Sequence, residues 1–426
     1  PLSTIGDLIT EASVDLLGND VADMAFMITN LAEQTLVARV PFEWSGSIPT
    51  QQSTKVVEVY HPEFTTAPDG TTVPDALVPQ NEACALTIPP RETRQIWIRF
   101  RSQDIKSGSY HGSLSVVPLV LSQEVSTVEI TLNVLPVSLP QSQRERVFVW
   151  DYQGDAERLG LEPQYHQMLA DHGVNVFIIH ALHDLPRNAI ADDGKFMEPL
   201  DFSRFRRMVS LKNPGMLYLS MDIWEKQKVR SAFGQEYYNI LWQQAFKEIM
   251  KQTLKELKSL KIEPTDVVVN PVDESCDQRY IEIARLWREI DPNVKLIADA
   301  STKDASEFQA VDPYVDIWCP HMKTLGLPEY AEFYNWVRAT GKPVWAYWYS
   351  EGANEKARAP LEYRMRHWTA FGHDLQGLGY WTATQHYGDP WHRYLSQAAY
   401  DPSLIYPGKT QAIPSRRWFA FHRGVL

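Results

Sequence analysis

From residue 146 onwards the sequence repeats one pattern eight times, a short apolar run followed by a helical or loop segment. The longest predicted helix spans 236–260, and its apolar residues are spaced to bury a single stripe. Eight strands alternating with helices over about 280 residues predict an α/β fold, a closed (β/α)8 TIM-like barrel rather than an open sheet. The predicted strands are 146–150, 174–179, 216–220, 267–270, 294–298, 315–318, 344–348 and 377–382.

The residues before this repeat have a different pattern, with short alternating strands and no helical spacing. Seven such strands separated by turn residues predict an immunoglobulin-like all-β sandwich. We therefore place a sandwich domain at 1–137, a polar linker at 138–144 and the barrel at 145–426. The predicted sandwich strands are 21–31, 35–44, 53–61, 83–88, 94–102, 109–118 and 126–135.

Composition excludes several classes of protein. The net charge is −12 and no Lys/Arg run occurs, which argues against a nucleic-acid partner. No apolar stretch has the length of a membrane span. The three cysteines are widely spaced and predict neither a disulfide framework nor a metal site. The chain begins at Pro1 without a methionine, so we expect a secreted or periplasmic protein whose signal peptide has been removed.

The fourth predicted barrel strand, 267–270, leads directly to two adjacent carboxylates, Asp273 and Glu274. The C-terminal ends of barrel strands hold the active site in this fold, so an acid pair at this position indicates catalysis. The alternative is a helix cap, since Asp often precedes a helix, although Asp277 could cap the following helix instead.

Adjacent acids on one strand rarely flank a sugar from both faces at the separation that a retaining glycosidase needs. They suit the exception in which the substrate's own 2-acetamido oxygen attacks the anomeric carbon. Glu274 would then be the general acid/base, while ionised Asp273 would orient the acetamido group and stabilise the developing charge.

Aromatic and polar residues at other strand ends are candidate sugar contacts. Tyr347 and Tyr349 lie on one strand face, and a tyrosine hydroxyl there could hold the acetamido oxygen. Trp381 ends the eighth strand and could form a wall of the pocket. His180 and His183 lack a third ligand, so we expect no metal, and no cofactor motif occurs. Further candidates for sugar binding are Trp224, Trp348, Trp391, Asp151, Asp222, His180, Asp299 and His321.

Four segments together resemble the glycoside hydrolase family 123 catalytic domain, a family that commonly carries an N-terminal β-sandwich. They are Asp273-Glu274, the run 342–347, the run from Arg364 through Trp368 to 377–381, and 404–408 with 414–417. The resemblance implies a cofactor-free barrel hydrolase that removes β-linked N-acetylgalactosamine by the substrate-assisted route. It carries the acid/base role to Glu274, the acetamido-orienting role to Asp273, and the family's tyrosine and tryptophan to Tyr347 and Trp381.

Three departures from the family pattern concern the predicted substrate face. Ser275 follows the acid pair where proline is expected, Gly379 replaces a bulkier apolar residue, and the run 384–386 differs from an asparagine-containing stretch. The acid pair and the family resemblance together predict a hydrolase of a terminal β-linked N-acetylhexosamine, with N-acetylgalactosamine favoured over N-acetylglucosamine.

Two alternatives remain open. The first keeps Glu274 as acid on a sugar without an acetamido group and uses a remote carboxylate as base or nucleophile. The second is a non-catalytic glycan-binding protein. The candidates for the remote carboxylate are Asp151, Asp222, Asp299 and Glu351.

Overall fold

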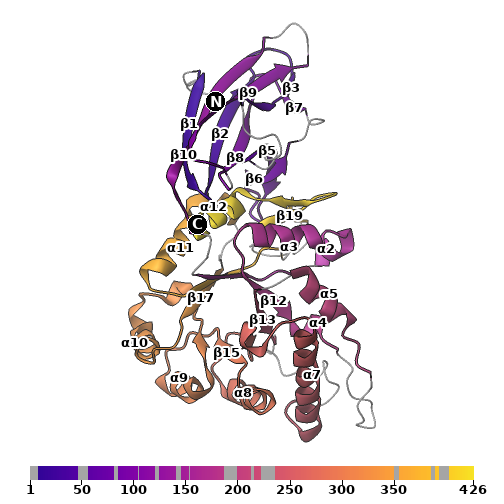
Figure 1. The fold of residues 1–426 in the computed structure, drawn as a ribbon, viewed down its shortest axis with the longest axis vertical. Helices are drawn as coiled ribbons and strands as arrows, with labels where there is room; N and C mark the ends of the chain where they lie inside the picture. Colours follow the sequence, from indigo (N-terminus) through magenta and orange to yellow (C-terminus); the bar gives the residue numbers. More distant parts are fainter. Residues whose placement is uncertain are drawn as a thin grey trace.

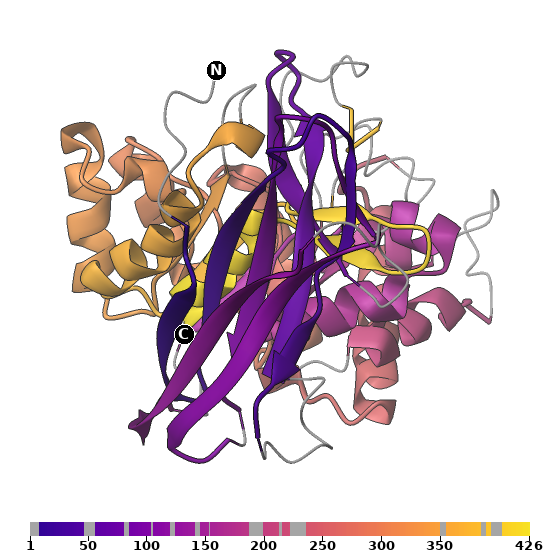
Figure 2. The same ribbon diagram turned by 90° about the horizontal axis from the view of Figure 1, so that it is seen from above.

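The chain forms an all-β part and an α/β part that lie end to end (Figure 1). Seen from above, the long strands of the first part cross over the helices of the second (Figure 2). This computed structural model describes residues 8–46, 56–80, 85–103, 105–119, 124–140, 145–152, 154–186, 199–212, 215–221, 236–349, 355–384, 389–392 and 403–426.

The all-β part consists of two packed sheets, as predicted. One sheet has the order β1-β10-β9-β3-β7, with β4 also paired to β9, and the other has the order β2-β8-β5-β6. Apolar residues of both sheets share one core, in which Ile98 and Leu132 are fully buried. The strands are β1 (Glu11–Gly18), β2 (Val21–Thr29), β3 (Leu36–Arg39), β4 (Phe42–Trp44), β5 (Val57–Thr66), β6 (Thr72–Pro79), β7 (Leu86–Ile88), β8 (Thr93–Arg101), β9 (Gly108–Pro118) and β10 (Ser126–Ser138).

Three features of this sandwich differ from the sequence prediction. The strands β1 and β6 were not predicted, and the single strand expected at 35–44 is divided into β3 and β4. β10 continues to Ser138, one residue beyond the predicted domain boundary.

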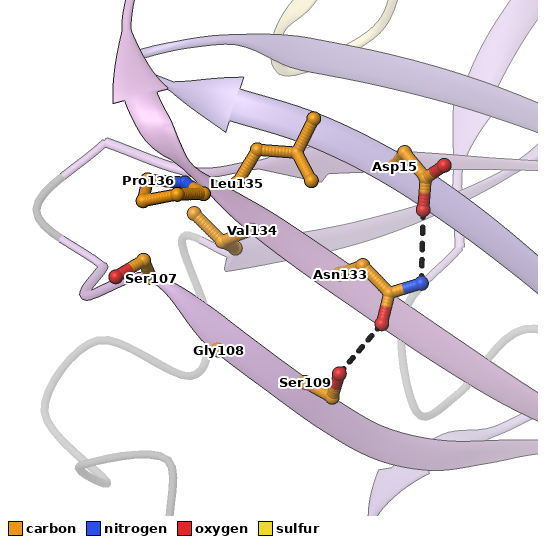
Figure 3. A pocket seen from close by; sticks show the side chains of 8 residues that line it. All are labelled: Asp15, Ser107, Gly108, Ser109, Asn133, Val134, Leu135 and Pro136. Atoms are coloured by element: carbon orange, nitrogen blue, oxygen red, sulfur yellow. Dashed lines mark hydrogen bonds between the residues drawn. The ribbon is translucent and has the colours of Figure 1, made fainter.

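A shallow recess of about 490 Å³ lies on the sandwich beside β1, β9 and β10 (Figure 3). Across its floor, Ser109 donates a hydrogen bond to Asn133 at 2.7 Å, and Asn133 donates one to Asp15 at 2.9 Å. These polar groups pair with one another and link three neighbouring strands, so we interpret them as part of the sheet's cross-strand pairing.

The α/β part is an eight-stranded parallel barrel, which confirms the predicted fold. Its strands have the order β16-β15-β14-β13-β12-β11-β18-β17. Parallel bridges from Trp318 to Val344 and from His321 to Tyr347 connect the first strand of this order to the last and close the barrel. The strands are β11 (Arg146–Val149), β12 (Val176–His180), β13 (Met216–Ser220), β14 (Val267–Asn270), β15 (Lys295–Ala298), β16 (Ile317–Trp318), β17 (Trp345–Tyr349) and β18 (Gly377–Trp381).

Helices surround the barrel, and none among the described residues is long and apolar enough to cross a membrane. The α-helices are α2 (Gly154–Leu159), α3 (Glu162–Asp171), α4 (Ala181–Asp184), α5 (Ser203–Lys212), α7 (Ile240–Ser259), α8 (Gln278–Ile290), α9 (Ala305–Val311), α10 (Ala331–Ala339), α11 (Pro360–Gly372) and α12 (Arg416–Val425). The short 3-10 helices are η1 (Pro264–Asp266), η2 (Asp312–Tyr314), η3 (Met322–Thr324), η4 (Pro328–Tyr330) and η5 (Glu355–Ala357), and a hairpin of β19 (Ile405–Pro407) and β20 (Ala412–Pro414) precedes α12.

Strand alternation separates the barrel's buried side chains into two layers. Val147 and Val149 of β11 face the surrounding helices, whereas Phe148 and Trp150 face the barrel interior. Aromatic rings fill that interior, and Phe148 stacks on Tyr218 at 5.6 Å between ring centroids. The barrel centre is therefore a packed core, which leaves the strand ends as the place for a site.

Gly379 makes room for this aromatic packing. A β-carbon at Gly379 would overlap the ring of Phe148 on the neighbouring strand β11. The departure at Gly379 thus lies in the packed barrel interior, and its predicted place at the substrate face is wrong. The physical reason is that the ring of Phe148, on the paired strand, fills the space that a bulkier side chain at position 379 would occupy.

We expect Gly379→Ala to lower the free energy of unfolding by about 2 kcal/mol, because overpacking a filled core forces strained side chains. Urea denaturation measures this loss. Gly372→Ala is the matched control, since a β-carbon there meets no atom within 4 Å. Equal stability of Gly379→Ala and the wild type would contradict the packing argument.

The sandwich is held to the barrel largely through α12 and the β19–β20 hairpin (Figure 1). The buried guanidinium of Arg99, from β8, lies 3.7 Å above the ring centroid of Phe419 in α12. Asp75 of β6 pairs with Arg417 of α12 at 2.9 Å, and neither side chain is exposed. These contacts make the two parts one continuous structure.

Candidate active site

Glu274 and Tyr347 meet at the C-terminal end of the barrel strands. Glu274 follows β14 and is exposed, whereas Tyr347, within β17, is 6% exposed. The Tyr347 hydroxyl donates a hydrogen bond to Oε1 of Glu274. Burial, with the nearby carboxyls of Asp299 and Glu274, raises the pKa of Tyr347. The hydroxyl therefore keeps its proton and acts as a fixed donor.

The backbone of Glu274 is in the left-handed region, with φ of 48°. Residues other than glycine are uncommon there, and such outliers concentrate at functional sites. The Glu274 N–H donates a hydrogen bond to Oδ1 of Asp299 at 2.9 Å. This contact joins the loop after β14 to the end of β15.

Asp299 lies beneath the acid pair and is 1% exposed. Its Oδ2 accepts a hydrogen bond from Nδ2 of Asn270, the last residue of β14, at 2.7 Å. Burial raises the pKa of Asp299 well above its usual range, and the negative charge of Asp273 raises it further. Asp273, which is half-buried, thus lies close enough to Asp299 for their charges to interact, and three carboxyl groups share one strand-end cluster.

Aromatic rings extend from this cluster around the barrel mouth. The ring centroid of Tyr349 lies 6.4 Å from that of Tyr347, in a stacked pair, and 6.0 Å from that of Trp381, edge to face. The indole N–H of Trp381 donates a hydrogen bond to the Tyr152 hydroxyl at 3.2 Å, and Tyr152 stacks on His180 at 4.5 Å. The rings form an arc, and such surfaces can pack against the C–H faces of a sugar.

His321 completes the arc on the other side of Tyr347. Its ring meets Tyr347 at 4.9 Å and Tyr349 at 4.6 Å, in both cases edge to face. Nδ1 of His321 accepts a hydrogen bond from the Lys323 backbone N–H at 3.1 Å. In the neutral ring the proton is therefore on Nε2.

Asp277, rather than the acid pair, caps the helix that follows. Its Oδ1 accepts a hydrogen bond from the Arg279 backbone N–H at 2.8 Å at the start of α8. The cap interpretation of Asp273 and Glu274 is therefore not needed to explain why α8 begins where it does.

Among the described residues there is also no cluster of three or more His, Cys, Asp or Glu side chains suited to a metal ion.

Comparison with known proteins identifies the family. The family model for the catalytic domain of glycoside hydrolase 123 matches residues 187–426, more than half of the chain. The chain belongs to glycoside hydrolase family 123. It is therefore a glycoside hydrolase whose substrate is a carbohydrate, as predicted.

The fold of this family 123 enzyme is similar to that of a family 123 glycoside hydrolase from Clostridium perfringens, whose structural study concerned glycolipid glycan hydrolysis. The TM-score is 0.75, covering 98% of this chain and 83% of that chain at 14% sequence identity. An endo-β-1,4-mannanase from Thermotoga petrophila is similar with a TM-score of 0.46, covering 67% of this chain and 77% of that chain at 12% identity. A search of curated proteins finds no match to the sequence.

The structure brings together most of the predicted site residues of this family 123 enzyme. Tyr347 touches Glu274, and Asp273 adjoins it in the chain. The rest of the group lies in the aromatic arc, namely Tyr349, Trp381, His180 and His321.

Three of the predicted sugar contacts lie away from the aromatic arc. Trp348 faces outward and packs against Tyr363 of α11, because its neighbours in β17 face inward. Asp151 also faces outward, where Nζ of Lys212 donates to it at 2.9 Å. Trp391 packs against Tyr406 of β19 with the two rings tilted by 41°, beside the sandwich.

Two other predicted residues, Asp222 and Trp224, lie outside the described residues, as does Glu351.

Conversely, two residues of the site were not predicted, Tyr152 and Asn270. The sequence signal for both is a polar side chain at a barrel strand end, and the structure shows that each has the parity of the inward-facing residues of its strand.

Proposed function

We propose that this enzyme hydrolyses a terminal β-linked N-acetylhexosamine, N-acetylgalactosamine first, by a substrate-assisted retaining mechanism. The proposal rests on one observation: Asp273 and Glu274 come from the same strand end and Tyr347 is hydrogen-bonded to Glu274. Both carboxylates thus approach a bound sugar from one side. A nucleophile from the other side is then supplied by the substrate's own acetamido oxygen.

In the first step, Glu274 donates its proton to the glycosidic oxygen as the C–O bond breaks. The acetamido oxygen attacks the anomeric carbon and forms an oxazolinium ion. Asp273 accepts a hydrogen bond from the acetamido N–H and stabilises the positive charge. The Tyr347 hydroxyl, which points at Glu274 in the free enzyme, is placed to donate to the acetamido oxygen once substrate is bound.

In the second step, water attacks the anomeric carbon from the face that the leaving group has vacated. Glu274, now ionised, removes a proton from that water, and the oxazolinium ring opens to restore the acetamido group. The sugar leaves with its β configuration retained. Glu274 ends the cycle protonated, so that protons and bonds balance.

A remote carboxylate is poorly supported among the described residues. Asp151 is paired with Lys212 outside the barrel interior, and Asp299 is buried under the loop that carries Glu274.

The family 123 glycoside hydrolase from Clostridium perfringens was studied for glycolipid glycan hydrolysis. We propose a glycan as the substrate of this enzyme too, with the acetamido sugar argued from the acid pair, and we propose that the enzyme is secreted or periplasmic.

Aryl β-glycosides with and without the 2-acetamido group test the mechanism. We expect turnover of the acetamido substrates alone, with competitive inhibition by the thiazoline analogue of the oxazolinium ion. Asp273→Asn should lower kcat by about 100-fold, because one charge-stabilising group worth about 2.7 kcal/mol is weakened. Hydrolysis of plain hexosides that resists thiazoline would rule out substrate assistance.

A further inference from the structure

We propose that Asp299 is a positioning residue that fixes the peptide of Glu274, so that the Glu274 carboxyl faces the leaving group. The inference builds on the proposed function, in which Glu274 is the general acid. Asp299 lies on the neighbouring strand and does not itself need to touch the sugar. Its effect would be transmitted through the Glu274 backbone.

The contacts of Asp299 tie the acid loop to the barrel. Oδ1 accepts the Glu274 backbone N–H at 2.9 Å, and Oδ2 accepts Nδ2 of Asn270 at 2.7 Å. Asn270 ends β14 and Asp299 directly follows β15, two strands that pair in parallel register. One carboxyl group thus spans a strand end and the loop that leaves it. Asn270 and Asp299 are positioned by the paired strands, so the Glu274 peptide of the loop is held against the sheet.

Such an anchor is needed because the Glu274 backbone is in an unfavourable conformation. Its φ of 48° places a non-glycine residue in the left-handed region. That conformation is unfavourable for a residue with a β-carbon and persists only where surrounding contacts hold it. The hydrogen bond to the Asp299 side chain holds the Glu274 N–H. Without it, Glu274 would gain freedom to relax and turn away from Tyr347.

The environment of Asp299 favours an uncharged anchor. Burial and the charge of Asp273 raise the pKa of Asp299, which favours the protonated carboxyl. A neutral carboxyl still accepts the Glu274 N–H through its carbonyl oxygen, and it adds no third negative charge beside Asp273. Asparagine should therefore imitate Asp299, because its Oδ1 accepts the Glu274 N–H and its Nδ2 donates to Oδ1 of Asn270 once the Asn270 amide turns over, whereas alanine should not.

The leaving group provides the test, because a misplaced general acid matters only when departure requires a proton. We expect Asp299→Ala to lower kcat/KM by about 100-fold on a phenyl β-N-acetylgalactosaminide, within the range of general acid catalysis. On the 2,4-dinitrophenyl glycoside, whose leaving group departs unprotonated, the loss should stay below about fivefold. Asp299→Asn should retain activity within about tenfold on both substrates.

Asp316→Ala is the matched control. Asp316 also accepts a backbone N–H of β15, that of Leu296 at 2.7 Å, but it does not contact Glu274. Asp316→Ala should change kcat/KM by the same factor on both substrates. If Asp299→Ala does not fold, Asn270→Ala removes the other half of the anchor and should show the same selectivity for the phenyl substrate. Thermal melting and thiazoline binding verify that each variant is folded.

An equal loss on the two leaving groups in a folded Asp299→Ala or Asn270→Ala variant would overturn the inference, as would full activity on both. Failure of the proposed function is a separate result, read from the wild type. If the wild type hydrolyses only glycosides without the acetamido group, substrate assistance fails. The phenyl and dinitrophenyl forms of those glycosides still test whether Asp299 positions Glu274.

Discussion

Glu274→Gln is expected to lower kcat/KM on phenyl β-N-acetylgalactosaminide by about 1000-fold or more, equivalent to about 4 kcal/mol of transition-state stabilisation. Glutamine cannot donate the carboxyl proton to the departing oxygen, so the phenolate must leave unassisted. The amide oxygen can still accept the Tyr347 hydrogen bond, and Glu274 is exposed. The substitution should therefore leave the fold unchanged, and initial rates measure its chemical effect directly.

The 2,4-dinitrophenyl glycoside separates the two steps in this variant. Its departure needs no proton, so a rapid burst of dinitrophenolate should persist while the second step, which needs Glu274 as base, remains slow. Glu307→Gln serves as control, because Glu307 is an exposed carboxylate on α9 of the next strand–helix unit. If Glu274→Gln hydrolysed the phenyl substrate within tenfold of wild type, another residue would have to be the acid.

The barrel could be predicted from the sequence because each of its strands is an apolar run of strand length with a helix or turn after it. The bounds of β13 (Met216–Ser220) and β14 (Val267–Asn270) match the predicted runs residue for residue. In the sandwich, β1 and β6 were missed for physical reasons. β6 contains Pro74 and Pro79, which weaken a strand pattern, and β1 pairs in parallel with β10, a contact distant in the sequence.

Predicting the site depended on which face of each strand turns inward. Tyr347 and Tyr349 were assigned to one face, and this alternation already implies that Trp348 faces the helices. For Asp151 the sequence offers no such guide, because both faces of β11 are apolar. Only the contact with Lys212 of α5, which is 61 residues away in the sequence, shows that the Asp151 carboxylate faces outward.

The role of Asp299 shows what a single sequence leaves undetermined. Its position at a strand end indicated a polar residue of the site, but not whether it reaches the sugar or supports the acid. The answer depends on the register between β14 and β15, which brings Asn270 and the Glu274 N–H to the same carboxyl group. Tertiary packing sets this register. The apolar runs 267–270 and 294–298 do not by themselves show how the two strands align with each other.

Asp75→Ala is expected to lower the free energy of unfolding of the barrel by about 3–5 kcal/mol, although Asp75 belongs to the sandwich. Arg417 of α12 has no exposed surface, and Asp75 accepts hydrogen bonds from its guanidinium and from the Tyr406 hydroxyl at 2.7 Å. Removing the carboxylate leaves a buried positive charge without its counter-ion.

Tryptophan fluorescence during urea denaturation measures this effect, because 12 of the 14 tryptophans lie at or beyond Trp150 and so report on the barrel. Glu33→Ala is the matched control: Glu33 pairs with Arg91 at the surface, with side chains 78% and 61% exposed, and its loss should cost less than about 1 kcal/mol. Asp75→Leu combined with Arg417→Met, which removes both charges, should recover part of the stability lost in Asp75→Ala. A barrel midpoint that did not move in Asp75→Ala would show that the sandwich and the barrel unfold independently, and that the buried pair does not couple them.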